Sequence, residues 1–191
     1  MTETETKVEL SAESFERLLA TATLLGVIDQ LNVYYDCADA ISKRSGSLRI
    51  RFVKDAAPVM TLKLSIERRA GRRVSTEIED LFARRLPPRQ LNVEELSSLF
   101  QPHLRRICDT PLRRLGAMRT RRNVVRLSSG EVIELDRVTL PGGQLFHEAE
   151  IESDDPAVHE TALAALRAAV PDWRYSDRGK FQRFREAMRN L

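Results

Sequence analysis

The stretch ETETK, residues 3–7, places a charged side chain at every second position. Side chains of a β-strand alternate between its two faces, so Glu3, Glu5 and Lys7 would share one face of a strand here. Two carboxylates and an amine do not belong in an apolar core. This face therefore either meets solvent or lines a charged interior, and the rest of the chain has to decide between the two.

The same charge-x-charge spacing recurs in later segments that are rich in strand-forming residues. Blocks of like charge on an open sheet face would repel one another across neighbouring strands. Around a closed barrel of eight strands, which is wide enough for one small ligand, they could instead surround that ligand. We therefore expect the charged faces to point inward and the apolar faces outward, under helices. The pairs are Arg49 and Arg51, Glu77 and Glu79, Arg119 and Arg121, Glu134 and Asp136, and Glu148 and Glu150.

Length and composition predict one ordinary globular domain over residues 1–191. The chain is 42% hydrophobic and 31% charged, and its net charge of only +3 argues against a general nucleic-acid coat protein. No apolar run is long enough for a bilayer and no signal peptide is apparent, so we expect a cytoplasmic protein without membrane association. Cys37 and Cys108 are too few for a disulfide framework and lack metal-ligand spacing, so we interpret them as half-buried thiols.

Periodicity predicts an α+β chain. Apolar residues at helical spacing predict helices over 11–26, 92–100, 155–170 and 177–191. The segments between them alternate and are separated by short turns such as SSGE and PGG, which predicts about eight strands. Because most of these strands are joined as hairpins, they should pair antiparallel.

The charged residue types indicate a chemistry. Mg²⁺ and Mn²⁺ prefer carboxylate oxygens and often share their coordination with substrate phosphates. The guanidinium of arginine matches phosphate oxygens, and lysine adds a point charge. Several bases and several acids, with no His or Cys ligand set, predict a polyanion bound together with a divalent metal. Phosphoryl transfer needs little more than in-line positioning and charge neutralisation.

In this order the motifs resemble the CYTH domain, the family of triphosphate tunnel metalloenzymes. The resemblance runs from residue 3 to 185 and includes GKFQRF (179–184), where the family has Ser-Lys-Tyr/Phe. It implies an eight-stranded antiparallel barrel whose charged tunnel binds a triphosphate. The other matching motifs are ETETK (3–7), VYYD (33–36), LRIR (48–51), TLK (61–63), TEIE (76–79), MRTRR (118–122), IELD (133–136) and FHEAE (146–150).

The resemblance also implies roles for individual residues. Gly179 replaces the serine of the C-terminal motif, and Arg119 stands where many members have lysine. The implied metal ligands are Glu3, Glu5, Glu77, Glu79, Asp136, Glu148 and Glu150. The implied phosphate-binding residues are Lys7, Arg49, Arg51, Lys63, Arg119, Arg121 and Lys180, and the implied catalytic set is Glu5, Lys7, Arg51, Glu148, Glu150 and Lys180.

The function expected from this resemblance is metal-dependent hydrolysis of a triphosphate, inorganic triphosphate first, by in-line attack of water with Mg²⁺ or Mn²⁺ bound. A class IV adenylyl cyclase and a thiamine triphosphatase are alternatives of the same fold. An alternative of another class is a module that binds polyphosphate without catalysis. Nucleic acid is not an expected partner, a homodimer is compatible with the sequence, and the organic part of the substrate is left open.

Overall fold

The structure is a computed structural model that describes residues 2–69, 72–153, 155–170, 173–176 and 178–191, with side chains described at all of these except 2, 3, 65–69, 72 and 73. The first half contains β1 (Thr2–Leu10), α1 (Ala12–Thr21), β2 (Thr23–Asp36), η1 (Ser42–Arg44), β3 (Ser47–Val53), β4 (Val59–Arg69), β5 (Arg72–Leu81) and β6 (Gln90–Leu91). The second half contains η2 (Val93–Glu95), α2 (Gln101–Leu104), β7 (Leu112–Arg126), β8 (Val132–Thr139), η3 (Pro141–Gly143), β9 (Leu145–Glu152), α3 (Pro156–Ala169), β10 (Arg174–Tyr175) and α4 (Lys180–Arg189).

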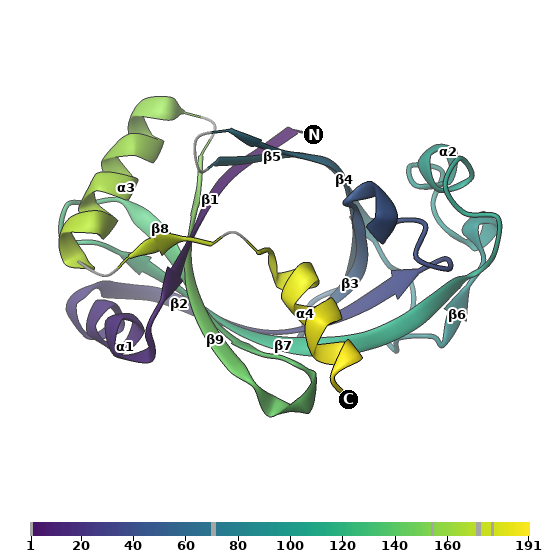
Figure 1. Ribbon diagram of the computed structural model, residues 1–191, viewed down its shortest axis with the longest axis horizontal. Coiled ribbons are helices and arrows are strands. Elements are labelled where there is room, and N and C mark those ends of the chain that lie inside the picture. The colour runs from purple at the N-terminus through teal and green to yellow at the C-terminus, as the bar shows by residue number, and fades with distance from the viewer. Residues whose placement is uncertain (1, 70–71, 154, 171–172, 177) are drawn as a thin grey trace.

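Eight strands form a closed antiparallel barrel, as the sequence predicts. The order around it is β1, β5, β4, β3, β2, β7, β8, β9, and β9 pairs back to β1 with Lys7 opposite Glu150. The short strands β6 and β10 are added to β7 and β1 outside this ring. Figure 1 looks along the barrel and shows the strands surrounding a central space.

The apolar faces of the strands point outward and are covered on two sides. On one side, β1, β8 and β9 pack against α1 and α3 through a cluster that includes Val8, Phe15, Leu135 and Leu166. On the opposite side, β2, β3 and β4 pack against residues 91–112, which include α2. Figure 1 shows α1 and α3 together on one flank and α2 on the other. The barrel wall therefore reverses the usual arrangement of a soluble protein: its outer face is apolar and its inner face is charged.

The second cluster contains a disulfide that the sequence interpretation missed. Cys37, at the end of β2, is bonded to Cys108, beyond α2, with the two Cα atoms 5.6 Å apart. Both residues are more fully buried than expected, and they are not free thiols. Their sequence separation of 71 residues gave no spacing signal, and only the packing of residues 91–112 on the barrel brings them together.

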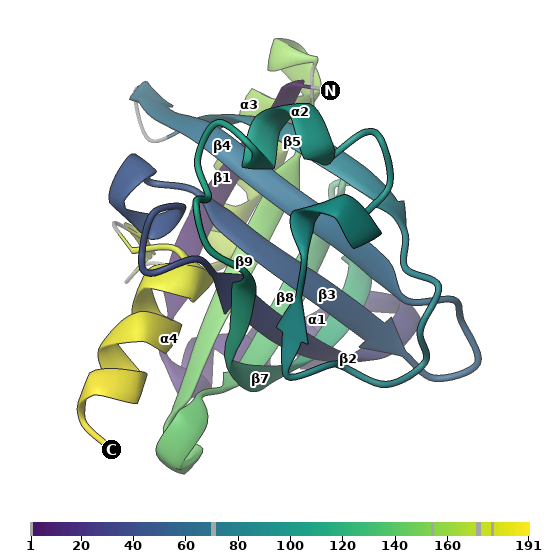
Figure 2. The ribbon, with the colours of Figure 1, turned by 90° about the vertical axis from the view of Figure 1, so that its right-hand side faces the viewer.

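Helix α4 lies at one end of the barrel. Phe184 is fully buried against Tyr34 and Met118, which point inward from β2 and β7. Figure 2 shows α4 and the turn between β3 and β4 at opposite ends of the barrel. Because α4 begins at Lys180, its first residue enters the barrel while the rest of the helix covers the opening.

Two predicted helices are shorter than their patterns suggested. Helix α1 ends at Thr21, and the chain then enters β2, whose first residues pair with β7. The β-branched residues of this region favour a strand over a longer helix. The segment 92–100 contains only the single turn η2; the Asn92 amide donates to the Glu95 carboxylate at 2.7 Å instead of capping a helix. The predictions for α3 and α4 are confirmed.

Candidate active site

The barrel interior contains a charged cavity of about 280 Å³. Six acidic and six basic side chains line it, together with Tyr34 from β2 and Phe181 from α4. Their alternation along each strand brings them inward, because every second residue of a strand faces the same side. The charged lining is Glu5, Lys7, Arg49, Arg51, Lys63, Glu77, Glu79, Arg122, Glu134, Glu150, Glu152 and Lys180.

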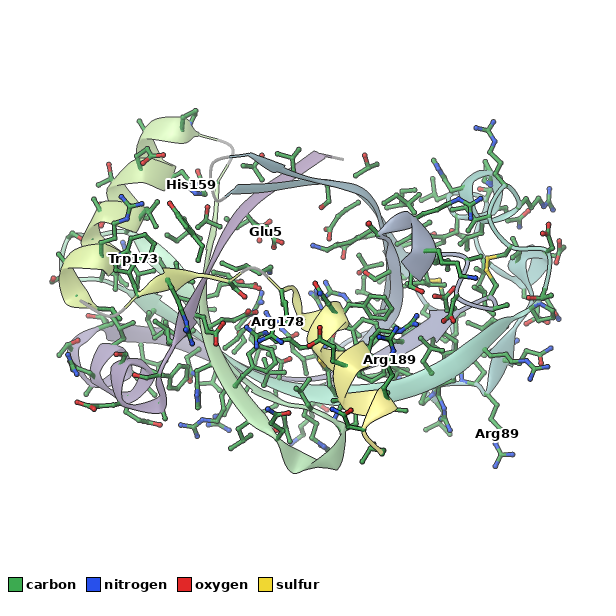
Figure 3. The ribbon with its side chains drawn as sticks, in the orientation of Figure 1. Glu5, Arg89, His159, Trp173, Arg178 and Arg189 are labelled. Atoms are coloured by element: carbon green, nitrogen blue, oxygen red, sulfur yellow. A yellow bond between two sulfur atoms is a disulfide. The ribbon has the colours of Figure 1, made fainter. Side chains whose placement is uncertain are left out.

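The opening strand provides two of these charges. Glu5 and Lys7 are both buried, and Figure 3 shows Glu5 within the ring of strands. The Lys7 ammonium contacts Glu5 Oε2 at 2.8 Å and also pairs with Glu150, which lies directly opposite on β9. The shared face predicted for ETETK is therefore an interior face for Glu5 and Lys7. The Glu3 side chain lies outside the described residues.

A triad of buried carboxylates lies next to Lys7. One oxygen from each of Asp136, Glu148 and Glu150 falls within 4.8 Å of the others. The register explains the cluster, because Asp136 on β8 is directly opposite Glu148 on β9. Lys180 reaches this triad from the start of α4: its ammonium lies 2.7 Å from Asp136 and 2.6 Å from Glu150, and it also pairs with Glu148.

Arg122 links the triad to the neighbouring strand. Its guanidinium donates to both oxygens of Asp136, at 2.9 and 2.7 Å, and to Glu150 at 2.6 Å, and it forms a further ion pair with Glu134. The strand register places Arg122 directly opposite Asp136. A planar guanidinium that contacts three carboxylates fixes their spacing on the wall.

Burial and charge shift the pKa values of these acids in different directions. Burial would raise the pKa of Glu150, but Lys180, Lys7 and Arg122 outweigh burial and hold it well below its usual range. The pKa of Asp136 is likewise lowered, against burial, by Lys180 and Arg122. Burial raises the pKa of Glu148, and it raises that of Glu134 to about 7. The site thus holds carboxylates of strongly different basicity within one cluster.

The two lysines remain charged in spite of burial. Burial alone would lower the pKa of Lys7, but Glu150 and Glu5 outweigh it and the pKa is raised. For Lys180 the balance is the same, with Asp136 and Glu148 raising its pKa well above the ordinary value. Both ammonium groups are therefore permanent counter-charges for the acidic wall.

The opposite wall is basic. Arg49 and Arg51 point inward from β3, and the Nε atoms of both are buried without a hydrogen-bond partner. Burial, together with the neighbouring charges of Arg49 and Arg122, lowers the pKa of Arg51 to about 10. Donors that are buried and unsatisfied carry a free-energy cost unless a ligand meets them. This wall is therefore suited to accept an anion.

The third part of the lining comes from β4 and β5. Lys63 forms an ion pair with Glu77, and Thr61 donates to Glu79 at 2.5 Å. The paired register of the two strands places each of these contacts across the ladder. Both glutamates line the cavity, as the sequence predicted, but neither belongs to the close carboxylate triad.

Two predicted phosphate-binding residues are not brought into the cavity. Arg119 and Arg121 lie on the outside of the barrel, where both are exposed. The inward positions of β7 are Thr120 and Arg122. The sequence RTRR offers arginines on both faces of the strand, so the charge-x-charge rule selected the wrong face. Arg122 is a site residue that the predictions missed, and Glu134 was expected to face inward but was given no role in the site. The alternation of MRTRRNVV alone could not distinguish the two faces.

The acidic wall fits a divalent cation. Its donors are carboxylate oxygens, the ligand type that Mg²⁺ and Mn²⁺ prefer, and two neighbouring strands, β8 and β9, hold them at metal-ligand spacing. Oε2 of Glu148 is buried without a hydrogen-bond partner, which leaves an oxygen available for coordination. Asp136, Glu148 and Glu150 are therefore the residues that would hold a metal.

The fold and the site define a closed barrel protein whose interior carries acidic and basic side chains on opposing strands. The CYTH domain matches residues 1–184, and the chain belongs to this family. No curated protein gives a significant sequence match.

Solved structures share this fold. HpAC1 from Hippeastrum is 23% identical, with a TM-score of 0.78, and the match covers 96% of this chain and 95% of HpAC1. The Bacillus halodurans protein bh2851 is 25% identical, with a TM-score of 0.69, over 94% of this chain and 95% of the other. PH1819 from Pyrococcus horikoshii is 21% identical, with a TM-score of 0.64, over 96% and 98%.

In the part of the chain that the structure describes, no helix has the length and apolar character needed to cross a membrane.

Proposed function

We propose that this chain, acting as one domain, is a metal-dependent hydrolase of a triphosphate, with inorganic triphosphate as the preferred substrate. The observation that carries the proposal is the pair of opposing walls in one buried cavity. Glu150, which belongs to the close triad with Asp136 and Glu148, lines the acidic side, and the arginines of β3 line the basic side. A buried acidic triad would repel a polyanion bound without metal, whereas metal-assisted phosphoryl transfer uses carboxylates to hold its cation.

The charged residues of the site would have different roles in this reaction. Arg49 and Arg51 would hold the non-reacting phosphates through their unsatisfied donors. Lys7 and Lys180, both buried and charged, would neutralise charge that develops on the transferred phosphate. Arg122 would keep the acidic wall in place. A divalent metal held by the triad would supply Lewis-acid polarisation of a phosphate oxygen.

The size of the cavity favours a compact substrate. At about 280 Å³ it lies just below the range for small-ligand sites, roughly 300–1,000 Å³. An inorganic anion with no organic group suits such a volume. The structural neighbour HpAC1 is described by its dominant triphosphatase activity, which agrees with this choice.

An organic triphosphate is a second candidate, and one observation favours it. A groove of about 690 Å³ between η1 and α4 shares Ser47, Gly179 and Phe181 with the charged cavity. A thiamine or nucleoside group attached to the triphosphate could lie in this groove and contact the Phe181 ring. Cyclase and thiamine triphosphatase activities both belong to this second candidate.

The test is phosphate release from inorganic triphosphate, ATP and thiamine triphosphate, with Mg²⁺, with Mn²⁺ and with a chelator. We expect fast, chelator-sensitive release from inorganic triphosphate. The variants Glu148→Gln and Glu150→Gln should lower turnover by about 100-fold or more, because each removes a ligand charge. Phe181→Ala is the probe for the groove: because Phe181 lines both the groove and the cavity, the variant should lower turnover of organic substrates by more than it lowers turnover of inorganic triphosphate.

Two results would overturn the proposal. Turnover that persists in the presence of chelator, or in both Gln variants, would remove the metal role. Metal-independent binding of polyphosphate that weakens steeply with salt, without any turnover, would identify a binding module instead.

A further inference from the structure

A large groove on the outside of the barrel is not used by the proposed reaction. Its volume is about 1220 Å³, and it crosses the outward face of β3, β2, β7 and β8 beneath the turns 53–58 and 81–85. It lies between the two flanks that the helices cover. Five basic residues line it, namely Lys54, Arg85, Arg119, Arg121 and Arg137, and the acidic side chains in the lining are Asp29 and Asp55.

The basic residues of the groove carry excess charge. Among the described residues, Lys54, Arg85 and Arg119 have no hydrogen-bond or ion-pair partner. Arg121 lies directly opposite Arg137 across the β7–β8 ladder. Like charges at opposite positions of a sheet destabilise it. Asp29 and Glu16 compensate these two arginines only in part, through exposed ion pairs of small worth.

The floor of the groove is apolar. Leu31 on β2 lies between Phe52 and Arg119 in the strand register, so an apolar pair directly adjoins the arginines. The turn at 81–85 adds Phe82 and the side chain of Leu81, which is 67% exposed. An exposed leucine beside half-buried phenylalanines, rimmed by charge, is typical of an interaction site.

These features select one class of partner. The volume exceeds the roughly 1,000 Å³ upper range of small-molecule pockets. Four adjacent strands span about 14 Å, which is the length of about four extended residues. Inorganic polyphosphate would make no use of the apolar floor. A continuous phosphate backbone would also meet Asp29, which sits beside Arg121 at 3.3 Å.

We propose that this groove docks an extended segment of a partner protein in which acidic side chains flank one or two apolar ones. The acidic side chains pair with the arginines of β7 and β8 at one end and with Lys54 and Arg85 at the other. The apolar side chains lie on Leu31 and Phe52. The peptide backbone is neutral, and the Asp29 carboxylate can accept hydrogen bonds from its N–H groups.

The test is fluorescence anisotropy of the full chain with labelled hexapeptides. The first probe has the sequence Asp-Glu-Leu-Phe-Glu-Asp, the second replaces Leu-Phe by Ser-Ser, and the third replaces every acid by lysine. Ten-residue oligothymidylate and long-chain polyphosphate are the comparison ligands. We expect only the first probe to bind with a Kd below about 1 mM.

Variants locate the binding. The double variant Arg119→Glu and Arg121→Glu should weaken the first probe by about tenfold or more, since it reverses the charge of the rim. Arg105→Glu and Arg106→Glu is the matched control: it makes the same charge change on exposed residues outside the groove and should alter affinity by less than about twofold. Leu81→Ser should also weaken the first probe. Thermal unfolding verifies that each variant is folded.

Three results would overturn the proposal. One is absence of binding by the first probe. A second is equal weakening by the two double variants, which would indicate non-specific charge attraction. A third is tighter binding of oligothymidylate or polyphosphate through the same arginines, which would assign the groove to a nucleic acid or a phosphate polymer.

Discussion

The ammonium of Lys180 lies 2.7 Å from Oδ2 of Asp136, at the centre of the buried carboxylate triad. Lys180 is the first residue of α4, so the helix that covers one end of the barrel also carries the counter-charge of its acidic wall. Lys7 contacts the same oxygen of Glu150 that Lys180 contacts. Three buried carboxylates are thus held together by cations from two distant parts of the chain.

Removing that counter-charge should change the response of the protein to metal. In Lys180→Met the triad keeps its carboxylates but loses a cation, so we expect the free energy of unfolding without metal to fall by about 3–5 kcal/mol. Mg²⁺ or Mn²⁺ should then raise the Tm more than in the unmodified chain, because the ion replaces the missing charge. Thermal unfolding with and without metal measures both effects.

The control for this variant is Arg189→Met, which removes an exposed cation from the last turn of the same helix. It should leave the metal-induced Tm shift unchanged. Equal metal-induced shifts in Lys180→Met and the unmodified chain would contradict a metal at the triad.

The face of β7 that enters the cavity can be tested with two neighbouring arginines. Arg122→Met removes the guanidinium that contacts Asp136, Glu150 and Glu134, and should lower triphosphatase kcat/KM by about 100-fold. Arg121→Met removes an exposed side chain and should leave kcat/KM within about twofold. Steady-state kinetics on inorganic triphosphate distinguish the two, and the reverse order of effects would refute the register.

How far the sequence predicted the site depends on the strand. On β1 and β9 the charged and apolar faces alternate cleanly, so Glu5, Lys7, Glu148 and Glu150 were placed correctly inside. On β7 three arginines within four residues occupy both faces, and no local pattern reveals which face the barrel encloses. The pairing of Arg122 on β7 with Asp136 on β8 shows which face is enclosed. This contact joins two strands and cannot be inferred from the local sequence of either one.

The closure of the barrel was also predictable from the alternation of charged and apolar faces along its strands. Apolar faces on every strand required a covering layer, and the helical patterns over 11–26 and 155–170 supplied part of it. The irregular cover over residues 91–112 carries no periodic signal, so neither its course nor the pairing of Cys37 with Cys108 could be foreseen. Segments without periodicity are fixed by what they pack against.

Stability should depend on pH through a contact between β1 and α4. Arg183 donates to Glu9 at 2.5 Å; burial would raise the pKa of Glu9, but this hydrogen bond and charge lower it. A lowered pKa stabilises the fold above the unfolded value of about 4.5, and this stabilisation is lost as the pH falls through the folded value. Glu9→Gln should therefore lower the free energy of unfolding by about 1–2 kcal/mol at pH 7, and by progressively less below pH 4.5.

Urea denaturation at pH 7, 5 and 3 measures this dependence. Glu13→Gln is the control, because Glu13 forms an exposed ion pair with Arg17 on α1 and should have almost no effect at any pH. A loss in Glu9→Gln that stays constant down to pH 3 would contradict the assignment of the effect to ionisation.

The disulfide should contribute measurably to stability. It closes a long loop between Cys37 and Cys108, and reduction should lower the free energy of unfolding by about 2–4 kcal/mol. Denaturation with and without dithiothreitol measures the difference, and thiol titration of the unfolded, unreduced protein should detect no free thiol. Two titratable thiols would contradict the bond. Disulfides persist in oxidising compartments, which contrasts with the cytoplasmic location expected from the sequence.

The pairing of β1 with β9 has a consequence for synthesis on the ribosome. Lys7 meets Glu150 across 143 residues, so the first strand emerges long before its partner exists. At a translation rate of about 5–20 residues per second, β1 waits on the order of ten seconds with its outward apolar face uncovered. Its alternating charges keep the waiting strand hydrated and disfavour pairing with other nascent chains. The charged residues of β1 that later line the cavity thus also protect the chain before there is a barrel.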